Sequence, residues 1–229
     1  GVSAHKYCLR YMIMNRKEAE VMEGSAPVIN LGNTATMNNL FWLQAVDVIC
    51  GAPDRHMNNI FVDLQGDHSV KFTGIDNDLS FGADFPLLEN MEDYSNYLKE
   101  KVEVYGAELM ERVPFFIPVL ENAFPCVSRP VYDSVMNLNS VDFADTLRGY
   151  LRDDEIVKAV ERLRGLQNYF ARLETEDKVL DFTDENDIDN AHKILLGHLK
   201  KMDKTSGYDE RIRARVFATS YFSLLLNGR

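Results

Sequence analysis

The chain has few cysteines and little positive charge, and each shortage argues against a class of protein. Cys8, Cys50 and Cys126 are odd in number and widely spaced, with no CxxC or Cys/His metal pattern among them. This usage predicts reduced thiols in a reducing compartment, and therefore a cytoplasmic location. A secreted effector is the alternative.

Basic residues are too few for a nucleic-acid-binding surface. The 25 Lys and Arg residues face 36 Asp and Glu residues, a net charge of −11. Such a balance argues against nucleic acid or an anionic membrane as the main partner. The most apolar stretch, LFWLQAVDVICGA (40–52), is short and contains Gln44 and Asp47. We therefore expect no transmembrane segment.

The remaining composition is that of an ordinary globular protein. The chain has 229 residues, of which 45% are hydrophobic and 27% are charged. One large domain or two small ones can be built from this length. Because the first residue is Gly1 rather than Met, we treat the chain as a piece of a longer protein.

The first half of the sequence predicts a strand, a buried helix and a hairpin. Residues 6–14 read as a strand and 15–33 as a polar loop with a short helix. Residues 36–50 are apolar almost all round, as in a helix buried on most sides, and Thr34 or Thr36 could cap it.

The two short runs that follow have β-type composition. NIFVDL (59–64) and SVKFTGI (69–75) are joined by QGDH, which predicts a β-hairpin.

After Gly82 the pattern becomes helical. We expect helices at 87–112, 153–173, 184–202 and 208–226. The clearest helix has apolar residues at three- and four-residue steps: Ile156, Val160, Leu163, Leu166, Phe170 and Leu173.

The acidic stretch at 174–189 lacks the central Gly and terminal Glu of a calcium loop, so we interpret it as a solvated loop and helix start. The expected fold is mainly α with a small β-hairpin.

A dense polar cluster stands between the buried helix and the hairpin. GAPDRHMNNIFVD (51–63) contains Asp54, Arg55, His56, Asn58 and Asn59. Taken singly, these residues have structural explanations: a turn cap for the acid, turn residues for the amides and a core hydrogen bond for the histidine. Their order and spacing together favour a functional site.

The hairpin is expected to bring this cluster back onto GIDNDLSFG (74–82). Asp54 and Asn59 at its entry would then face Asp76 at its exit. Carboxylate and amide oxygens suit Mg²⁺, which takes hard oxygen ligands and leaves other positions to water and phosphate. Asn59 and Asp76 could hold the ion, and Asp54 could accept the proton of an attacking hydroxyl.

These motifs carry a resemblance to a known family. DRHMNNIFV (54–62) resembles the DRHxxN catalytic loop of atypical kinases, found in phosphoinositide 3- and 4-kinases and in a similar form in HipA-like kinases. GIDNDLSFG is similar to the metal-binding aspartate motif of that superfamily, especially in kinases of the Golgi casein kinase and four-jointed type. The resemblance covers about residues 36–82.

The resemblance implies a protein-kinase-like C-lobe that uses ATP with Mg²⁺ or Mn²⁺. Asp54 matches the catalytic aspartate, with Arg55 and His56 completing its loop. Asn59 and Asp76 match the metal-binding residues that also contact the nucleotide phosphates.

Asp78 stands where many relatives have a small residue, so it is either an extra metal ligand or incidental. The implied organisation is a hinge-like strand and loop at 1–35, the site at 36–86 and a helical C-lobe subdomain at 87–229.

The sequence departs from a complete kinase at its N-lobe. No Gly-rich phosphate loop is present, and Lys6 lies too close to Asp54 to be the usual strand lysine. We consider three explanations: the N-lobe has been cut away, has been replaced by something compact, or has been lost together with catalysis. We favour the first because of Gly1.

Three functions remain open at this point. The first is a phosphotransferase acting on a hydroxyl of a protein or small molecule. The second is a non-catalytic pseudokinase or helical interaction module. The third is nucleotidyl transfer on the same scaffold. A lipid substrate is disfavoured because the segment ADFPLLENMEDY (83–94) has no basic residue.

Overall fold

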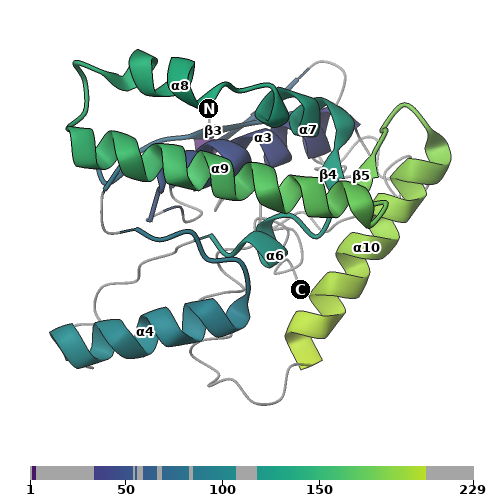
Figure 1. Ribbon diagram of the computed structural model, residues 1–229. Helices are drawn as coiled ribbons and strands as arrows, with labels where there is room; N and C mark the ends of the chain where they lie inside the picture. Colours follow the sequence, from purple (N-terminus) through teal and green to yellow (C-terminus); the bar gives the residue numbers. More distant parts are fainter. Residues whose placement is uncertain are drawn as a thin grey trace.

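A computed structural model describes residues 2–3, 34–53, 55, 59–65, 69–82, 85–106 and 118–204. This part of the chain is mainly helical, with a small antiparallel sheet and a two-stranded parallel sheet (Figure 1). The helices are α3 (Thr34–Cys50), α4 (Met91–Tyr105), α6 (Leu120–Ala123), α7 (Arg129–Met136), α8 (Ser140–Leu147), α9 (Asp153–Thr175) and α10 (Glu185–Lys204). The strands are β1 (Val2–Ser3), β2 (Ile60–Leu64), β3 (Val70–Gly74), β4 (Val127–Ser128) and β5 (Val179–Leu180). The expected mainly helical fold with a hairpin is confirmed.

The core forms where α9 crosses α3, and Figure 1 shows the two helices side by side. Phe41 on α3 and Phe170 on α9 are both fully buried, and both belong to the main hydrophobic cluster. Phe124 lies between them, with its ring 6.2 Å from Phe41 and 5.0 Å from Phe170. Burying such rings contributes about 1.5–3 kcal/mol each, so this crossing is the rigid base of the fold.

Helix α3 confirms the predicted buried helix and begins at Thr34, two residues early. Thr36 is not its cap. The Thr36 side chain is buried within the first turn, and its Oγ1 accepts a hydrogen bond from the Val70 amide at 2.9 Å. This bond fastens the hairpin to the start of the helix.

The predicted hairpin is confirmed in β2 and β3. Its antiparallel register pairs Ile60 with Gly74 and Leu64 with Val70. β1 adds a third strand by pairing Val2 with Val62, a pairing that the sequence did not indicate. Both Ile60 and Val70 are buried against the core, so one face of the hairpin is held against the helices.

The helix predicted at 87–112 begins later and ends earlier than expected. The Asn90 side chain accepts hydrogen bonds from the amides of Glu92 and Asp93, and Asp93 accepts from the Asn90 amide. This capping box starts α4 at Met91. The helix ends before Gly106, whose φ of 80° suits glycine.

The acidic stretch at 174–189 is only partly a solvated loop. Asp181 and Asp184 are exposed, as expected, and α10 begins at Glu185. Leu180 and Phe182, however, are 3% and 5% exposed and belong to the main core. They are held there because β5 pairs in parallel with β4.

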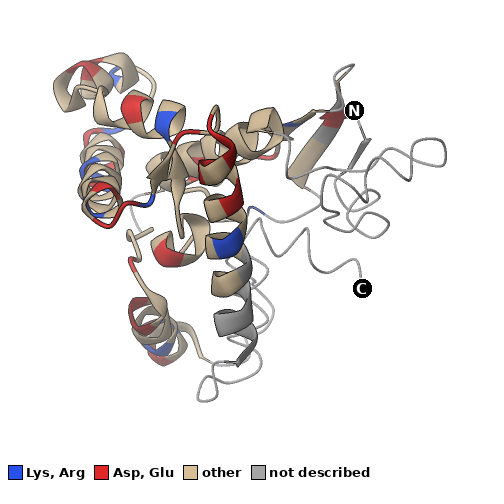
Figure 2. Cartoon of the chain, turned by 90° about the vertical axis from the view of Figure 1, so that its right-hand side faces the viewer, with Lys and Arg blue, Asp and Glu red and all other residues tan. Residues whose placement is uncertain are grey.

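Other expectations fall outside the described residues, namely the strand at 6–14, the loop at 15–33 and the helix at 208–226. No helix in the described part of the chain is both long and apolar enough to cross a membrane. Over the same part, Figure 2 shows Lys and Arg scattered singly among Asp and Glu.

Candidate functional site

The structure describes four of the predicted site residues: Arg55, Asn59, Asp76 and Asp78. Asp54 and His56 lie outside the described residues, so their predicted roles stay predictions.

Arg55 is the centre of the described site. Its side chain is 5% exposed, and its Nε and Nη2 donate to the two carboxylate oxygens of Asp47 at 2.9 Å each. Nη1 donates to the carbonyl oxygens of Asn59 at 2.8 Å and Ile75 at 2.7 Å. Nη2 also donates to Oδ1 of Asn77. One guanidinium therefore joins the last turn of α3, the start of β2 and the segment after β3.

The guanidinium suits this position because of its shape and permanent charge. It presents five donors in a rigid planar fork, which a lysine cannot reproduce. Asp47 supplies the counter-charge from α3, with only 1% of its surface exposed. Its role was missed in the sequence, where it served only as an interruption of an apolar stretch. An acid inside an apolar helix, eight residues before an arginine, is the signal that could have found it.

The hairpin brings Asn59 and Asp76 to the same end of the sheet. The Ile75 amide donates to the Asn59 carbonyl at 2.9 Å, which continues the β2–β3 ladder by one step. Asn59 therefore lies just before the last strand pair, and Asp76 directly follows the residue bonded to Asn59. Asn59 is buried and Asp76 is exposed, so the pair lies at the boundary between the core and solvent.

The segment after β3 has an unusual backbone. Asp76 and Phe81 have φ values of 58° and 64°, a region that L side chains enter at a cost of about 1–2 kcal/mol each. Hydrogen bonds hold this shape: the Phe81 amide donates to the Cys50 carbonyl at 2.6 Å, and the Ser80 amide donates to the Asn77 carbonyl at 3.0 Å. Strained residues held in place in this way are frequent at functional sites.

A second buried arginine, Arg162 of α9, holds the other side of this segment. Its Nε donates to the Ile49 carbonyl at 3.0 Å, and Nη1 donates to the carbonyls of Gly82 and Phe85 at 3.3 Å. Its Nη2 lies 3.4 Å from the Cys50 carbonyl. The last carbonyls of a helix have no partner within it and carry partial negative charge, which a cation stabilises. Burial lowers the pKa of Arg162.

The sequence reasoning missed Arg162. It falls among the apolar positions of α9, directly before Leu163, which is fully buried. A cation on the apolar face of a helix is the signal that could have indicated it.

Cys50 ends α3 between the two arginines. Burial, followed by the charge of Asp47, raises the pKa of its thiol to about 11, although Arg162 and Arg55 act in the opposite direction. The thiol is therefore protonated at neutral pH and unsuited to act as a nucleophile.

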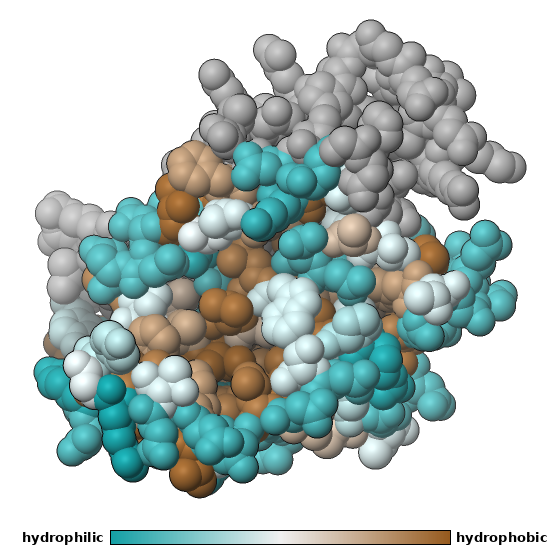
Figure 3. Space-filling view, turned by 90° about the horizontal axis from the view of Figure 1, so that it is seen from above, coloured by the Kyte–Doolittle hydropathy of each residue, from teal (hydrophilic) through white to brown (hydrophobic). Residues whose placement is uncertain are grey.

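A cavity of about 490 Å³ opens beside the site, between α3, β3 and the segment after β3. Its described lining is Asn39, Trp42, Leu43, Val46, Asp47, Cys50, Arg55, Lys71, Phe72, Thr73, Gly74, Asn77, Ser80 and Phe81. Figure 3 looks onto the upper side of Figure 1 and shows a hollow in which hydrophobic residues gather. Trp42 and Val46 are 39% and 49% exposed, so part of the apolar wall faces solvent.

Within the described residues, no group of three or more His, Cys, Asp and Glu side chains is close enough together to hold a metal ion. The predicted ligands are Asn59, Asp76 and Asp78. This finding does not cover Asn59, which is an amide, or Asp54, which lies outside the described residues. The ligand set stays a prediction.

Comparisons of the chain with protein-family models, with curated proteins and with solved structures give no match.

Proposed function

We propose that this chain carries the catalytic half of a kinase-like phosphotransferase. Asp54 accepts the proton of an acceptor hydroxyl, and Asn59 and Asp76 bind the Mg²⁺ or Mn²⁺ ion that accompanies ATP. The observation that carries the proposal is the hydrogen-bond network of Arg55, which joins the loop holding the catalytic aspartate to the segment holding the second metal ligand.

The network supports this chemistry because phosphoryl transfer depends mainly on positioning and charge neutralisation. A divalent ion needs its protein oxygens held within a fraction of an ångström. Asn59 is buried directly before β2. Asp76 has a strained backbone, and Arg55 holds both of its neighbours by donating to the Ile75 carbonyl and to Oδ1 of Asn77. A flexible surface loop would not supply this accuracy.

The surrounding elements favour a C-lobe-like scaffold. A buried helix (α3) leads into the loop, a hairpin follows, and a second arginine braces the segment beyond Gly82 against α9. The acceptor is a hydroxyl of a protein or small molecule. The other half of the nucleotide clamp would come from outside the part of the chain that the structure describes.

Transfer of label from ATP tests the proposal. The full chain is incubated with Mg²⁺ and γ-labelled ATP, with mixed proteins as acceptors, and the same experiment is run with Asp54→Ala. Loss of a general base is expected to lower the rate by about 10²–10⁴-fold. Asp189→Asn, which removes one exposed charge on α10, is the matched control and should leave the rate unchanged.

Two outcomes would overturn the assignment. Full activity of Asp54→Ala would remove the catalytic role from that residue. Incorporation of label from α-labelled ATP, with none from γ-labelled ATP, would instead identify nucleotidyl transfer.

A further inference from the structure

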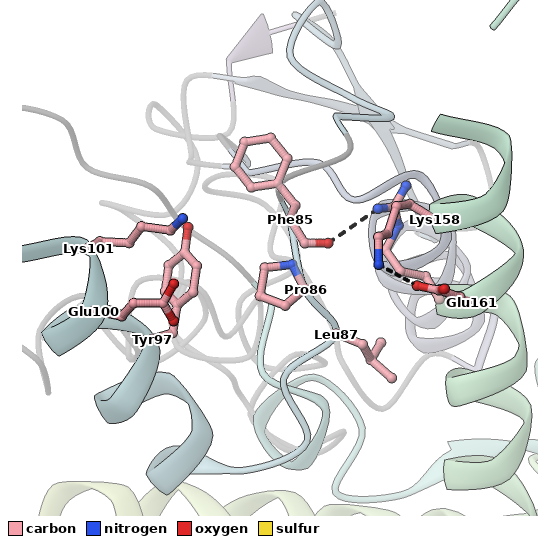
Figure 4. A pocket seen from close by; sticks show the side chains of 9 residues that line it. Phe85, Pro86, Leu87, Tyr97, Glu100, Lys101, Lys158 and Glu161 are labelled. Atoms are coloured by element: carbon pink, nitrogen blue, oxygen red, sulfur yellow. Dashed lines mark hydrogen bonds and ion pairs between the residues drawn. The ribbon is translucent and has the colours of Figure 1, made fainter. Parts of the chain in front are cut away.

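A second cavity, of about 360 Å³, lies between α4 and α9 and is separate from the predicted metal site. Figure 4 shows its two walls and its floor. Tyr97, Glu100 and Lys101 project from α4 on one side, Lys158 and Glu161 project from α9 on the other, and Phe85, Pro86 and Leu87 lie between them. None of the predicted metal ligands Asn59, Asp76 and Asp78 is among its described lining residues.

The charged residues that line this cavity differ in how deeply they are buried. Arg162 lines it and is only 3% exposed, Lys101 and Lys158 are half-buried, and Glu100 and Glu161 are exposed. Water and salt screen exposed charges far more than buried ones. The buried and half-buried charges of the described lining are therefore all positive, although the chain as a whole has a net charge of −11.

The Arg162 cation has no direct ion pair with an acid among the described residues, and the exposed Glu161 attracts it only from a longer distance. All the hydrogen bonds of Arg162 go to backbone carbonyls, and in the described part of the chain no carboxylate lies within ion-pair distance of it. Carbonyl dipoles satisfy its donors without cancelling its charge. A buried charge that lacks a counter-charge is costly, so an anion entering the cavity would be stabilised.

The two lysines differ in how they are held. The Lys158 ammonium forms an ion pair with Glu161 at 2.7 Å. The Lys101 ammonium lies over the rings of Tyr97 and Tyr105, at 5.3 and 5.8 Å from their centroids. A cation held over aromatic rings keeps its charge available to a ligand, whereas a cation paired with an acid must first exchange its partner.

The rest of the lining is apolar. Phe85, Pro86 and Leu87 form the floor, and the Tyr97 ring is 9% exposed beside Lys101. The volume exceeds that of a lone inorganic anion and leaves room for an apolar group attached to it. We propose that this cavity binds a phosphate monoester with an apolar stem, either on a protein side chain or on a small molecule.

Titration with phenyl phosphate tests this site, using the full chain at neutral pH without metal or nucleotide. Amide chemical shifts or calorimetry report binding. Phenyl phosphate should bind and inorganic phosphate should bind roughly tenfold more weakly, since it cannot use the apolar floor. Lys101→Ala should weaken binding about fivefold and Lys158→Ala about twofold, because the Lys158 ammonium must first leave Glu161. Lys193→Ala, a change at an exposed position of α10, should have no effect.

Glu161→Gln should strengthen phenyl phosphate binding, whereas the lysine substitutions should weaken it. It removes a negative charge and frees Lys158 from its ion pair, so binding should become about twofold to fivefold tighter. A merely structural effect on the cavity would not strengthen binding. Thermal unfolding of each variant confirms that the fold is retained.

Absence of phenyl phosphate binding, or equal affinity in the chain and in the combined Lys101→Ala and Lys158→Ala variant, would overturn the proposal. Asp76→Ala should bind phenyl phosphate normally, so this test does not depend on the proposed catalytic site. An acetylated phosphotyrosine amide identifies the source: tighter binding than phenyl phosphate indicates a protein side chain, and equal binding indicates a small molecule.

Discussion

Arg55 reaches back to Asp47 and contacts both of its carboxylate oxygens, with the two side chains only 5% and 2% exposed. The ion pair links the last turn of α3 to the start of the polar loop. Arg55 also donates to the carbonyls of Asn59, just before β2, and Ile75, just after β3, and so holds the hairpin where the chain enters and leaves it. Arg55 therefore contacts Asn59 directly and the two chain neighbours of Asp76.

Replacing Arg55 by alanine should be strongly destabilising. The change removes the charged group that faces the buried Asp47 carboxylate, which costs about 3–5 kcal/mol. Urea unfolding measures the loss. Arg129→Ala is the matched control, because its ion pair with Glu174 has a similar length, 2.8 Å, but is 39% and 41% exposed. That variant should lose much less stability, because water screens an exposed pair. Equal losses would show that the buried pair has no special role.

Replacing Gly51 and Gly197 by alanine should change the free energy of unfolding in opposite directions. Gly51 has a φ of 61°, and a Cβ there would lie 2.7 Å from the Arg162 guanidinium carbon. Gly51→Ala should therefore lower the free energy of unfolding by at least about 1–2 kcal/mol. Gly197 lies inside α10, and a Cβ there would meet nothing within 4 Å, so Gly197→Ala should raise the free energy of unfolding by about 0.5–1 kcal/mol. Thermal unfolding compares them, and a stabilised Gly51→Ala would contradict the geometry at the end of α3.

Cys50 should make stability fall at alkaline pH. Burial raises the pKa of its thiol from 9.0 to about 11, so above pH 9 the unfolded chain releases this proton more readily than the folded chain. The contribution to stability is complete below the unfolded pKa and is lost as the pH rises through the folded value. Urea midpoints of the chain and of Cys50→Ala, measured across this range, should differ in slope, with the variant falling less steeply. Identical slopes would contradict the burial of the thiol.

Much of this fold could be predicted from local patterns. The apolar run from Leu40 to Ile49 predicts a buried helix, and the β-type runs on either side of QGDH predict the hairpin. The three- and four-residue spacing of Leu163, Leu166 and Phe170 determines the buried face of α9. In each case the signal lies within one element.

The remaining features depend on contacts between distant residues. Arg162 meets Ile49 across more than a hundred residues, and no local pattern indicates that pairing. The apolar residues from 87 onward favour an earlier helix start, but the capping box of Asn90 starts α4 at Met91. Phe182 follows β5 closely in the chain, and it is buried where β5 pairs with β4. Asn59 and Asp76 could be placed together only because a hairpin connects them.

The central claim is tested most directly by calorimetric titration of the full chain with Mg²⁺ and ATP. The account predicts metal-dependent binding that is lost in Asp76→Ala and kept in Asp189→Ala, an exposed residue on α10. Asp76→Ala removes no buried side chain, so it should unfold within about 1 kcal/mol of the parent chain, a loss that reflects the φ of 58°, which Asp adopts more readily than Ala. Binding of equal strength in the parent chain and in Asp76→Ala would contradict the proposed metal site.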